Sequence, residues 1–148
     1  MDGLEALNPS LVYTISSSEL LNWSTMQGAC RPRHRALCKH LAVTADIDTR
    51  DGFPKEALKA DVVLLATPTQ YHVRAEDQRI VGLLARDVRE RRGIGTSFEQ
   101  LPGEYALSNG IRVQVFRRVN PLRSEDVNAL SEELLRAYPT RGDLFALK

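Results

Sequence analysis

The stretch Asp61-Val62-Val63-Leu64-Leu65-Ala66-Thr67 is the most apolar run of this chain. Its length suits one strand, and a continuous apolar run is typical of a strand buried on both faces, which predicts a central position in a sheet. Two shorter apolar runs precede it, at residues 11–16 and 41–47. Segments with helical spacing separate these runs. This alternation predicts right-handed βαβ units with three parallel strands, in the spatial order second, first, third.

A hairpin is predicted after the three strands. Ser108-Asn109-Gly110 lies between two alternating runs, and Asn-Gly supplies the positive φ angles of a tight hairpin turn. We therefore expect residues 104–118 to extend one edge of the sheet. The predicted fold class is α/β: a three-layer Rossmann-like sandwich, in which helices cover both faces of a short parallel sheet extended by a C-terminal antiparallel hairpin.

Helices are predicted from apolar residues at helical spacing and from capping residues. A helix is expected to start at Ser16, where Glu19 completes a capping box, and to run to about Met26. Gly28 and Pro32 interrupt it, because proline lacks an N–H and clashes with the preceding turn. The other predicted helices are residues 33–41, 54–58, 75–92 with Gly93 as C-terminal cap, and 124–138.

Composition indicates one ordinary globular domain. Apolar residues make up 43% of the 148 residues, charged residues 26%, and the formal net charge is +1, so no nucleic-acid partner is expected. No window approaches the roughly 20 apolar residues that span a bilayer, and the acidic start Met1-Asp2-Gly3-Leu4-Glu5 does not resemble a signal peptide. Residues 1–148 are taken as a single α/β domain, with a lead-in at 1–10 and a tail at 140–148.

The two cysteines, Cys30 and Cys38, lie eight residues apart in a segment expected to be largely helical. An intact helix would separate them by about 12 Å along its axis, whereas a disulfide needs Cα atoms within about 7 Å, so no pairing is expected. Cys30, His34 and Cys38 share one helical face, with His40 nearby. Pro32 disturbs that face and no second ligand pair closes a tetrahedron, so we expect no metal.

The predicted ligand site lies where the parallel strands end, because loops diverge there and leave a crevice. Its candidate residues follow the second and third predicted strands: Asp46, Asp48, Asp51, Gln70, Tyr71 and His72. The aspartates could accept hydrogen bonds from sugar hydroxyls, and Gln70 and His72 could contact the same ligand. His72 could act as an acid or base, although aspartates also simply form good turns.

No cofactor is expected. The first predicted strand is followed by Ser16-Ser17-Ser18 instead of a glycine-rich turn, so backbone amides cannot approach a pyrophosphate and nucleotides should bind weakly at most.

Two basic clusters could contact phosphate groups or an anionic lipid surface. The first comprises Arg31, Arg33, His34, Arg35 and Lys39, and the second comprises Arg86, Arg89, Arg91 and Arg92. Acidic residues lie near the second cluster, so a solvated helix face is the simpler interpretation of it.

Several segments of residues 10–120 share a family resemblance. They are Asn22-Trp23-Ser24-Thr25-Met26-Gln27-Gly28, Ala60-Asp61-Val62-Val63-Leu64-Leu65-Ala66-Thr67-Pro68-Thr69-Gln70-Tyr71-His72, Glu76-Asp77-Gln78-Arg79-Ile80-Val81, Gly93-Ile94-Gly95, Phe98-Glu99, Leu101-Pro102, Asn109-Gly110-Ile111-Arg112-Val113 and Phe116-Arg117-Arg118. Together they resemble the soluble tail domain of bacterial multi-span membrane glycosyltransferases. These are the polyprenyl-phosphate-sugar-dependent enzymes related to protein mannosyltransferases.

This resemblance implies a domain without catalytic residues of its own, because the family's catalytic acid lies in a loop beside the transmembrane helices. The expected partner is the transmembrane part of the parent enzyme, with weak sugar or lipid-phosphate contact and a location at the membrane, outside the cytoplasm. Two alternatives remain open. One is a free-standing, cytoplasmic small-molecule or nucleotide-binding enzyme, and the other is an interaction domain that uses the arginine clusters.

Overall fold

A computed structural model describes residues 1–147 and contains a mixed four-stranded sheet. Its strands are β1 (Val12–Ile15), β2 (Val62–Thr67), β3 (Phe98–Ala106) and β4 (Arg112–Arg118). The order is β1-β2-β4-β3, with β1 and β2 parallel and the other two pairs antiparallel. The most apolar run therefore forms an inner strand, as predicted from its composition.

The expected strand at 41–47 is the main correction to the predicted fold. Only Leu41 bridges the sheet, pairing in parallel with Val12. Beyond it, side chains make the contacts to β1: the Thr44 hydroxyl donates to the Thr14 carbonyl at 3.0 Å, and the Tyr13 hydroxyl accepts from the Ala45 N–H at 2.9 Å. The sheet thus has a single parallel strand pair instead of three parallel strands.

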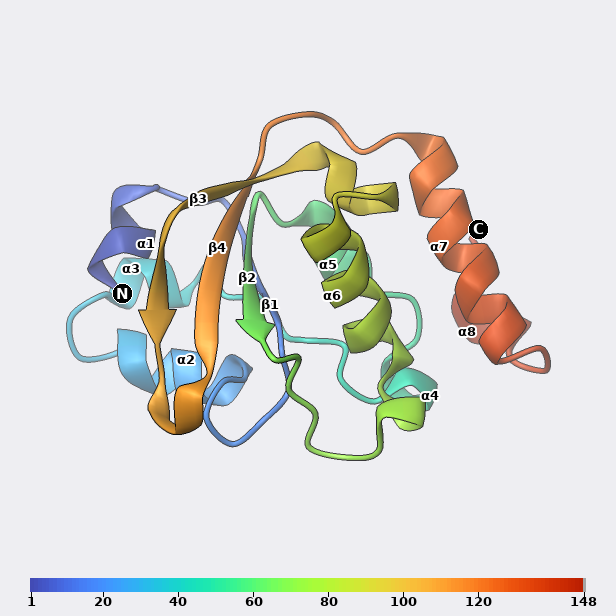
Figure 1. Cartoon of the computed structure of the whole chain (residues 1–148), viewed down its shortest axis with the longest axis horizontal. Coiled ribbons are helices and arrows are strands. Elements are labelled where there is room, and N and C mark those ends of the chain that lie inside the picture. Colours follow the sequence, from blue (N-terminus) through green and yellow to red (C-terminus); the bar gives the residue numbers. More distant parts are fainter. Residues whose placement is uncertain (148) are drawn as a thin grey trace.

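Eight helices and three short 3₁₀ turns surround the sheet in the described part of the chain (Figure 1). The helices are α1 (Asp2–Ala6), α2 (Trp23–Cys30), α3 (Arg35–Cys38), α4 (Asp48–Asp51), α5 (Lys55–Lys59), α6 (Arg79–Glu90), α7 (Ser124–Ala137) and α8 (Gly142–Phe145). The 3₁₀ turns are η1 (Ala75–Asp77), η2 (Gly93–Ser97) and η3 (Ser108–Gly110).

Short helices form within the predicted lead-in and the predicted tail. The first residues form α1, which buries Leu4, and residues 142–145 form α8, which buries Phe145 completely. The Phe145 ring stacks on Tyr138 with 5.1 Å between ring centroids, and the Ser131 hydroxyl donates to the Phe145 carbonyl at 2.6 Å. The apolar side chains that the sequence places in these segments thus complete the core.

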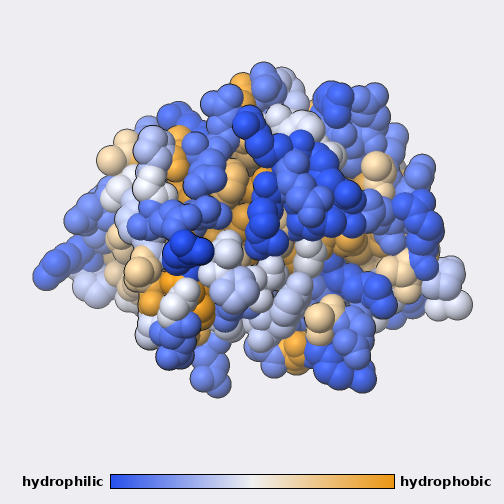
Figure 2. Space-filling view, viewed as in Figure 1, coloured by the Kyte–Doolittle hydropathy of each residue, from blue (hydrophilic) through white to orange (hydrophobic). Residues whose placement is uncertain are grey.

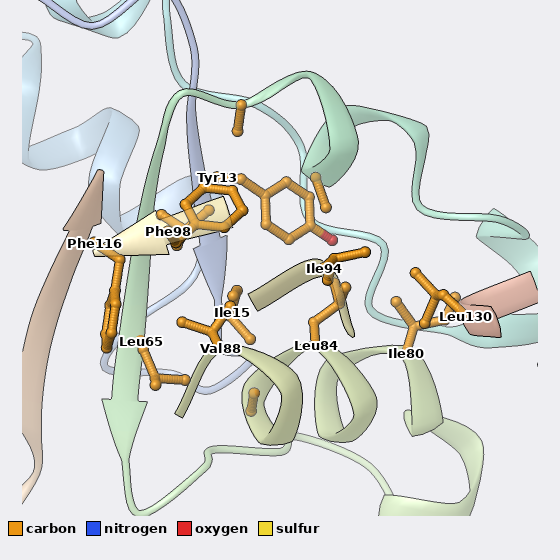
Figure 3. Packing of buried hydrophobic residues seen from close by; sticks show 14 of the residues in the cluster. Tyr13, Ile15, Leu65, Ile80, Leu84, Val88, Ile94, Phe98, Phe116 and Leu130 are labelled. Atoms are coloured by element: carbon orange, nitrogen blue, oxygen red, sulfur yellow. The ribbon is translucent and has the colours of Figure 1, made fainter. Parts of the chain in front are cut away.

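The larger apolar cluster lies on one face of the sheet (Figure 3). Alternate residues of β1 and β2, among them Tyr13, Ile15 and Leu65, point toward α6, whose Leu84 and neighbouring apolar residues cover them. Helices α5, α7 and α8 also contribute to this cluster, which includes Phe145.

The second apolar cluster lies on the opposite face. The intervening strand residues Val12 and Leu64 and the β4 residue Val115 pack there against Met26 of α2 and Leu4 of α1. Because successive side chains of a strand point to opposite faces, each apolar strand supplies both clusters. Helices therefore cover both faces, and β2 is buried along nearly its whole length.

The hairpin forms at the predicted place, with positive φ angles at Asn109 (61°) and Gly110 (73°), but its strands are joined by the 3₁₀ turn η3 instead of a two-residue turn, and β3 begins earlier than expected, at Phe98. Its outer strand, β3, is an edge of the sheet and is largely exposed. The pairing of β3 with β4 shifts between Gln100 and Glu104, where Pro102 and Gly103 lie. A bulge with proline at an edge strand disfavours edge-to-edge pairing with another chain.

The expectation that Cys30 and Cys38 remain apart is wrong, because they form a disulfide. The segment is not one helix: α2 ends at Cys30, Pro32 lies in the following turn, and α3 begins at Arg35. This turn brings the two Cα atoms to 5.7 Å. The proline that disturbs the helical face is thus what makes the pairing possible.

Helix ends differ from the prediction in several places: the helix expected at 33–41 is only Arg35–Cys38, and α6 starts at Arg79 instead of 75. Helix α2 begins after Asn22, not at Ser16, because Asn22 and Thr25 form a reciprocal capping box. Helix α6 ends with Arg91 in the left-handed conformation, two residues before the expected Gly93.

No helix among residues 1–147 is long and apolar enough to cross a membrane. The face of the molecule seen in Figure 2 is mostly hydrophilic, and hydrophobic residues show only as small patches between polar ones.

Candidate functional site

A pocket of about 490 Å³, lined mostly by residues with polar side chains, opens at the end of the sheet where β1 finishes. Three parts of the chain line it: residues 17–24, which lead from β1 into the first turn of α2; the segment from Val43 to Asp46 with Arg50; and His72 in the loop after β2. Strand β1 and the parallel β2 end side by side, so the loops that follow them meet here.

Ser17, Asp46 and His72 form the centre of the pocket. The Ser17 hydroxyl donates to Asp46 Oδ2 at 3.1 Å and lies 2.5 Å from His72 Nδ1. Asp46 Oδ2 is 3.8 Å from the same ring nitrogen. Both polar neighbours therefore meet one nitrogen of the imidazole. This differs from a nucleophilic triad, in which the serine and the aspartate bind opposite ring nitrogens.

Gln78 fixes the two loops to each other from beneath the pocket. Its side chain is 0% exposed. Its Oε1 accepts from the backbone N–H groups of His72 (3.0 Å) and Val73 (3.3 Å), and its Nε2 donates to the Asp46 carbonyl at 2.5 Å. Nε2 also lies 3.1 Å from His72 Nδ1. A buried amide with its polar atoms satisfied in this way makes the local geometry rigid.

Arg50 and Asp51 support the other wall. Arg50 pairs with Asp46 Oδ1 at 2.5 Å and with Asp51 Oδ1 at 2.6 Å. Asp51 also accepts from the N–H groups of Asp46 and Ile47. Burial raises the pKa of Asp51, but the bonds from Arg50 and the two backbone N–H groups outweigh this effect and lower the pKa overall. Asp51 is thus mainly a turn former that holds Arg50 and Asp46 in place.

Asp48 lies outside the pocket and has a structural position. Its buried carboxylate accepts from the N–H groups of Arg79 (2.7 Å) and Ile80 (3.1 Å), at the start of α6, and from the Tyr138 hydroxyl (2.6 Å). Burial is the largest influence on this group and raises its pKa despite these hydrogen bonds. Asp48 therefore joins α4, the N-terminus of α6 and α7.

Gln70 and Tyr71 also point away from the pocket. The Gln70 carbonyl accepts from the Ser17 N–H at 3.0 Å, which ties the two loops together, while its side chain donates to the Pro68 carbonyl. The Tyr71 hydroxyl lies against α6 at Gly82, where an added Cβ would sit 3.0 Å from it. Of the six candidates, Asp46 and His72 line the pocket itself.

Several pocket residues were not singled out from the sequence. Ser17 belongs to a serine run, Trp23 and the supporting Gln78 occur only within the resembling segments, and Arg50 belongs to no motif. No local pattern marks them, because they come from separate turns that only the folded chain brings together.

The pocket offers hydrogen-bond donors and acceptors close together, and its lining includes a second carboxylate, Glu19. Serine hydroxyls and Arg50 can donate, Asp46 can accept, and the half-buried Trp23, held by a hydrogen bond from its Nε1 to the Leu41 carbonyl, lines one wall. Pairing of Arg50 with two aspartates leaves little positive charge for a phosphate. Among residues 1–147, no group of three or more His, Cys, Asp or Glu side chains could hold a metal ion.

The two basic clusters have different surroundings. In the second, Arg86 pairs with Asp87 (2.9 Å) and Glu133 (2.8 Å), and Arg92 pairs with the same aspartate. These arginines are therefore part of a neutralised network between α6 and α7. In the first, the arginines at positions 31, 33 and 35 are exposed and make no ion pair with any described residue.

Comparison with family models, with curated proteins and with solved structures gives no significant match for this chain.

Proposed function

We propose that this chain is a non-catalytic accessory domain of a membrane glycosyltransferase, situated outside the cytoplasm, and that its pocket binds a sugar and so shapes acceptor access. The observation that carries the proposal is the composition of the pocket: hydroxyl groups, one amide, one paired arginine, two carboxylates and one imidazole surround a space walled by Trp23.

Sugar recognition requires donors and acceptors close together, because each hydroxyl group can both donate and accept. Ser17, Asp46 and Arg50 supply both kinds of group next to one another in the pocket. An indole ring adds an apolar surface for the C–H face of a sugar ring. The arginine is already neutralised, which favours an uncharged sugar over a nucleotide.

The accessory role rests on the resemblance described above. Most of the resembling segments fall on β2, β3 and β4, which are neighbours in one sheet, and on the start of α6 and on η2, while one falls on α2. A disulfide is typical of oxidising compartments, so the Cys30–Cys38 pair is consistent with a location outside the cytoplasm. Packing of this domain on a transmembrane part belongs to the same proposal.

Amide-shift titration of the ¹⁵N-labelled chain with neutral monosaccharides, uronic acids and nucleotides tests the ligand. Neutral sugars should shift the Ser17, Thr44 and His72 amides and the Trp23 indole N–H. His72→Ala should weaken binding about tenfold, equal to about 1.4 kcal/mol. His40→Ala is the matched control, since His40 is exposed and outside the pocket. Shifts with nucleotides alone would contradict the proposal and favour the free-standing enzyme.

The gene tests the accessory role separately. A reading frame that continues upstream of these residues into many apolar helices supports it. Start and stop codons that frame only this segment would refute it.

A second candidate function rests on the exposed, unpaired arginines beside the disulfide. This turn could bind an anionic surface, with a strong dependence on salt. Binding to vesicles containing anionic lipid should then fall in the triple variant Arg31→Gln, Arg33→Gln, Arg35→Gln. The matched control, with the same loss of charge at exposed arginines elsewhere, is Arg112→Gln, Arg117→Gln, Arg136→Gln. Equal binding by both triple variants would exclude the candidate.

A further inference from the structure

The hydroxyl of Ser17 lies between the carboxylate of Asp46 and the imidazole of His72. The direction of its single hydrogen determines which nitrogen of the imidazole is protonated. The hydroxyl donates to Asp46 Oδ2 at 3.1 Å. It also lies 2.5 Å from His72 Nδ1. Since a serine hydroxyl has one hydrogen, the second contact is a hydrogen bond only if Nδ1 is the donor.

We propose that Asp46 and Ser17 are positioning residues that hold His72 as the neutral Nδ1–H tautomer, so that Nε2 presents its lone pair to the pocket and accepts a hydrogen bond from a ligand hydroxyl. The identity of this ligand rests on the proposed function, whereas the tautomer does not. In the described chain Nε2 has no hydrogen-bond partner, and His72 lines the pocket.

Gln78 opposes this arrangement. Its Oε1 faces two backbone N–H groups, so the amide orientation is set and Nε2 must be the atom 3.1 Å from His72 Nδ1. An amide N–H there would favour an unprotonated Nδ1. The chain of bonds from the imidazole through Ser17 to Asp46 ends on a charge, and charge-assisted hydrogen bonds are roughly twice as strong as neutral ones. The contact of Nδ1 with Ser17 is also shorter than its contact with Gln78. We therefore expect Nδ1 to carry a proton and to donate it to Ser17.

Because of this competition, the presence of the Ser17 hydroxyl determines which nitrogen of the His72 ring carries the proton. When Ser17 is replaced by alanine, Nδ1 loses the acceptor within hydrogen-bond distance, because Asp46 Oδ2 is 3.8 Å away, and Gln78 Nε2 at 3.1 Å becomes its nearest polar neighbour. The ring should then carry its proton on Nε2 and accept from Gln78 through Nδ1. The pocket would present a donor in place of an acceptor, and a ligand hydroxyl could no longer donate to the ring.

Long-range ¹H–¹⁵N NMR of the histidine rings in the ¹⁵N-labelled chain tests this inference, at about pH 8.5, where an ordinary imidazole is neutral. His34→Gln and His40→Gln spectra assign the His72 signals. Wild-type His72 should show a protonated Nδ1 and an unprotonated Nε2, and Ser17→Ala should reverse the two. The matched control is Ser24→Ala, because Ser24 is exposed in the same pocket and has no described hydrogen bond to His72; it should leave the tautomer unchanged.

A protonated Nε2 in the wild-type protein overturns the inference, whether or not the Ser17→Ala variant folds. An unchanged tautomer in folded Ser17→Ala also overturns it. Titration with glucose and galactose tests the ligand contact: a sugar that shifts the pocket amides should also shift Nε2. Amide shifts without a change at Nε2 would overturn that contact. Absence of sugar binding would refute the proposed function. It would not affect the tautomer, which the spectrum of the ligand-free protein tests separately.

Discussion

Asp46, Asp48 and Asp51 show how far the surroundings of one residue type differ within a short segment. Asp46 faces the pocket and binds a serine and an arginine. Asp48 is buried and binds the first N–H groups of α6. Asp51 accepts from its own turn. Each carboxylate therefore has a separate task, which depends on the donors that the fold brings to it.

Leu64 lies on the inner strand and tests the second apolar cluster, since its side chain is 3% exposed. Leu64→Ala should lower the free energy of unfolding by about 2–5 kcal/mol through lost burial and a residual cavity. Urea denaturation measures the change. Leu20→Ala is the control, because Leu20 is 39% exposed. A loss of less than about 1 kcal/mol at Leu64 would show that it is not in the core.

Asp61 anchors the start of β1 and makes stability depend on pH. Its carboxylate accepts from the N–H groups of Ser10 (3.0 Å) and Leu11 (2.8 Å). Burial raises its pKa, but these bonds outweigh burial and lower the pKa below the ordinary value of 3.8. A lowered pKa in the folded state stabilises the protein above pH 3.8, and the stabilisation is lost as the pH falls through the folded-state pKa.

Asp61→Asn should therefore cost about 1–3 kcal/mol near neutral pH. The difference from the wild-type protein should shrink as the pH falls below 3.8. Denaturation curves over a pH series measure this trend. Asp77→Asn serves as control, since Asp77 pairs with the exposed Arg74. A difference that grows in acid would contradict the assignment.

At the scale of elements, α2 and α3 form a helix–turn–helix unit closed by the Cys30–Cys38 disulfide. The turn between them also meets α1, because His34 lies 2.6 Å from Glu5 and 3.0 Å from Asp2. The disulfide thus stabilises a unit that covers the second apolar cluster.

Removal of this disulfide should destabilise the chain. For a closed loop of this length the lost constraint corresponds to about 2–3 kcal/mol. The double variant Cys30→Ala, Cys38→Ala should show this loss in urea denaturation. A reducing agent should lower the stability of the wild-type protein by a similar amount and leave the double variant unchanged. Equal sensitivity of both proteins to reductant would argue against the disulfide.

At the scale of the whole molecule, the two apolar clusters share the same strands. Tyr13 belongs to one cluster and its neighbour Val12 to the other, and Leu65 and Leu64 of β2 divide in the same way. A strand cannot lose its contacts on one face and keep the geometry of the other, so we expect both clusters to unfold in one cooperative transition.

Phe145→Ala tests this coupling from the far end of the chain. Phe145 belongs to the first cluster, whereas Trp23, the single tryptophan, packs against the second. The substitution should cost about 3–5 kcal/mol. It should shift the Trp23 fluorescence transition and the far-ultraviolet circular dichroism transition together. Separate midpoints would show that the clusters unfold independently. Leu147→Ala, at a site 43% exposed, is the control.

The sequence by itself determined the elements whose signals are local. The apolar run at 62–67 predicted an inner strand, Asn109-Gly110 predicted the hairpin turn, and helical spacing predicted α6 and α7 to within a few residues. Strand burial, turn conformation and helix amphipathicity all depend on neighbouring residues, so they can be recognised without the rest of the fold.

The tertiary structure alone decided how distant segments meet. It replaced a strand at 41–47 with side-chain contacts to β1, folded Cys30 onto Cys38, and placed Phe145 in the core. It also brought Ser17, Asp46 and Gln78 around His72. These contacts join residues far apart in the chain, and their partners depend on the path of the backbone between them. The path of the backbone therefore cannot be predicted from any local pattern of residues.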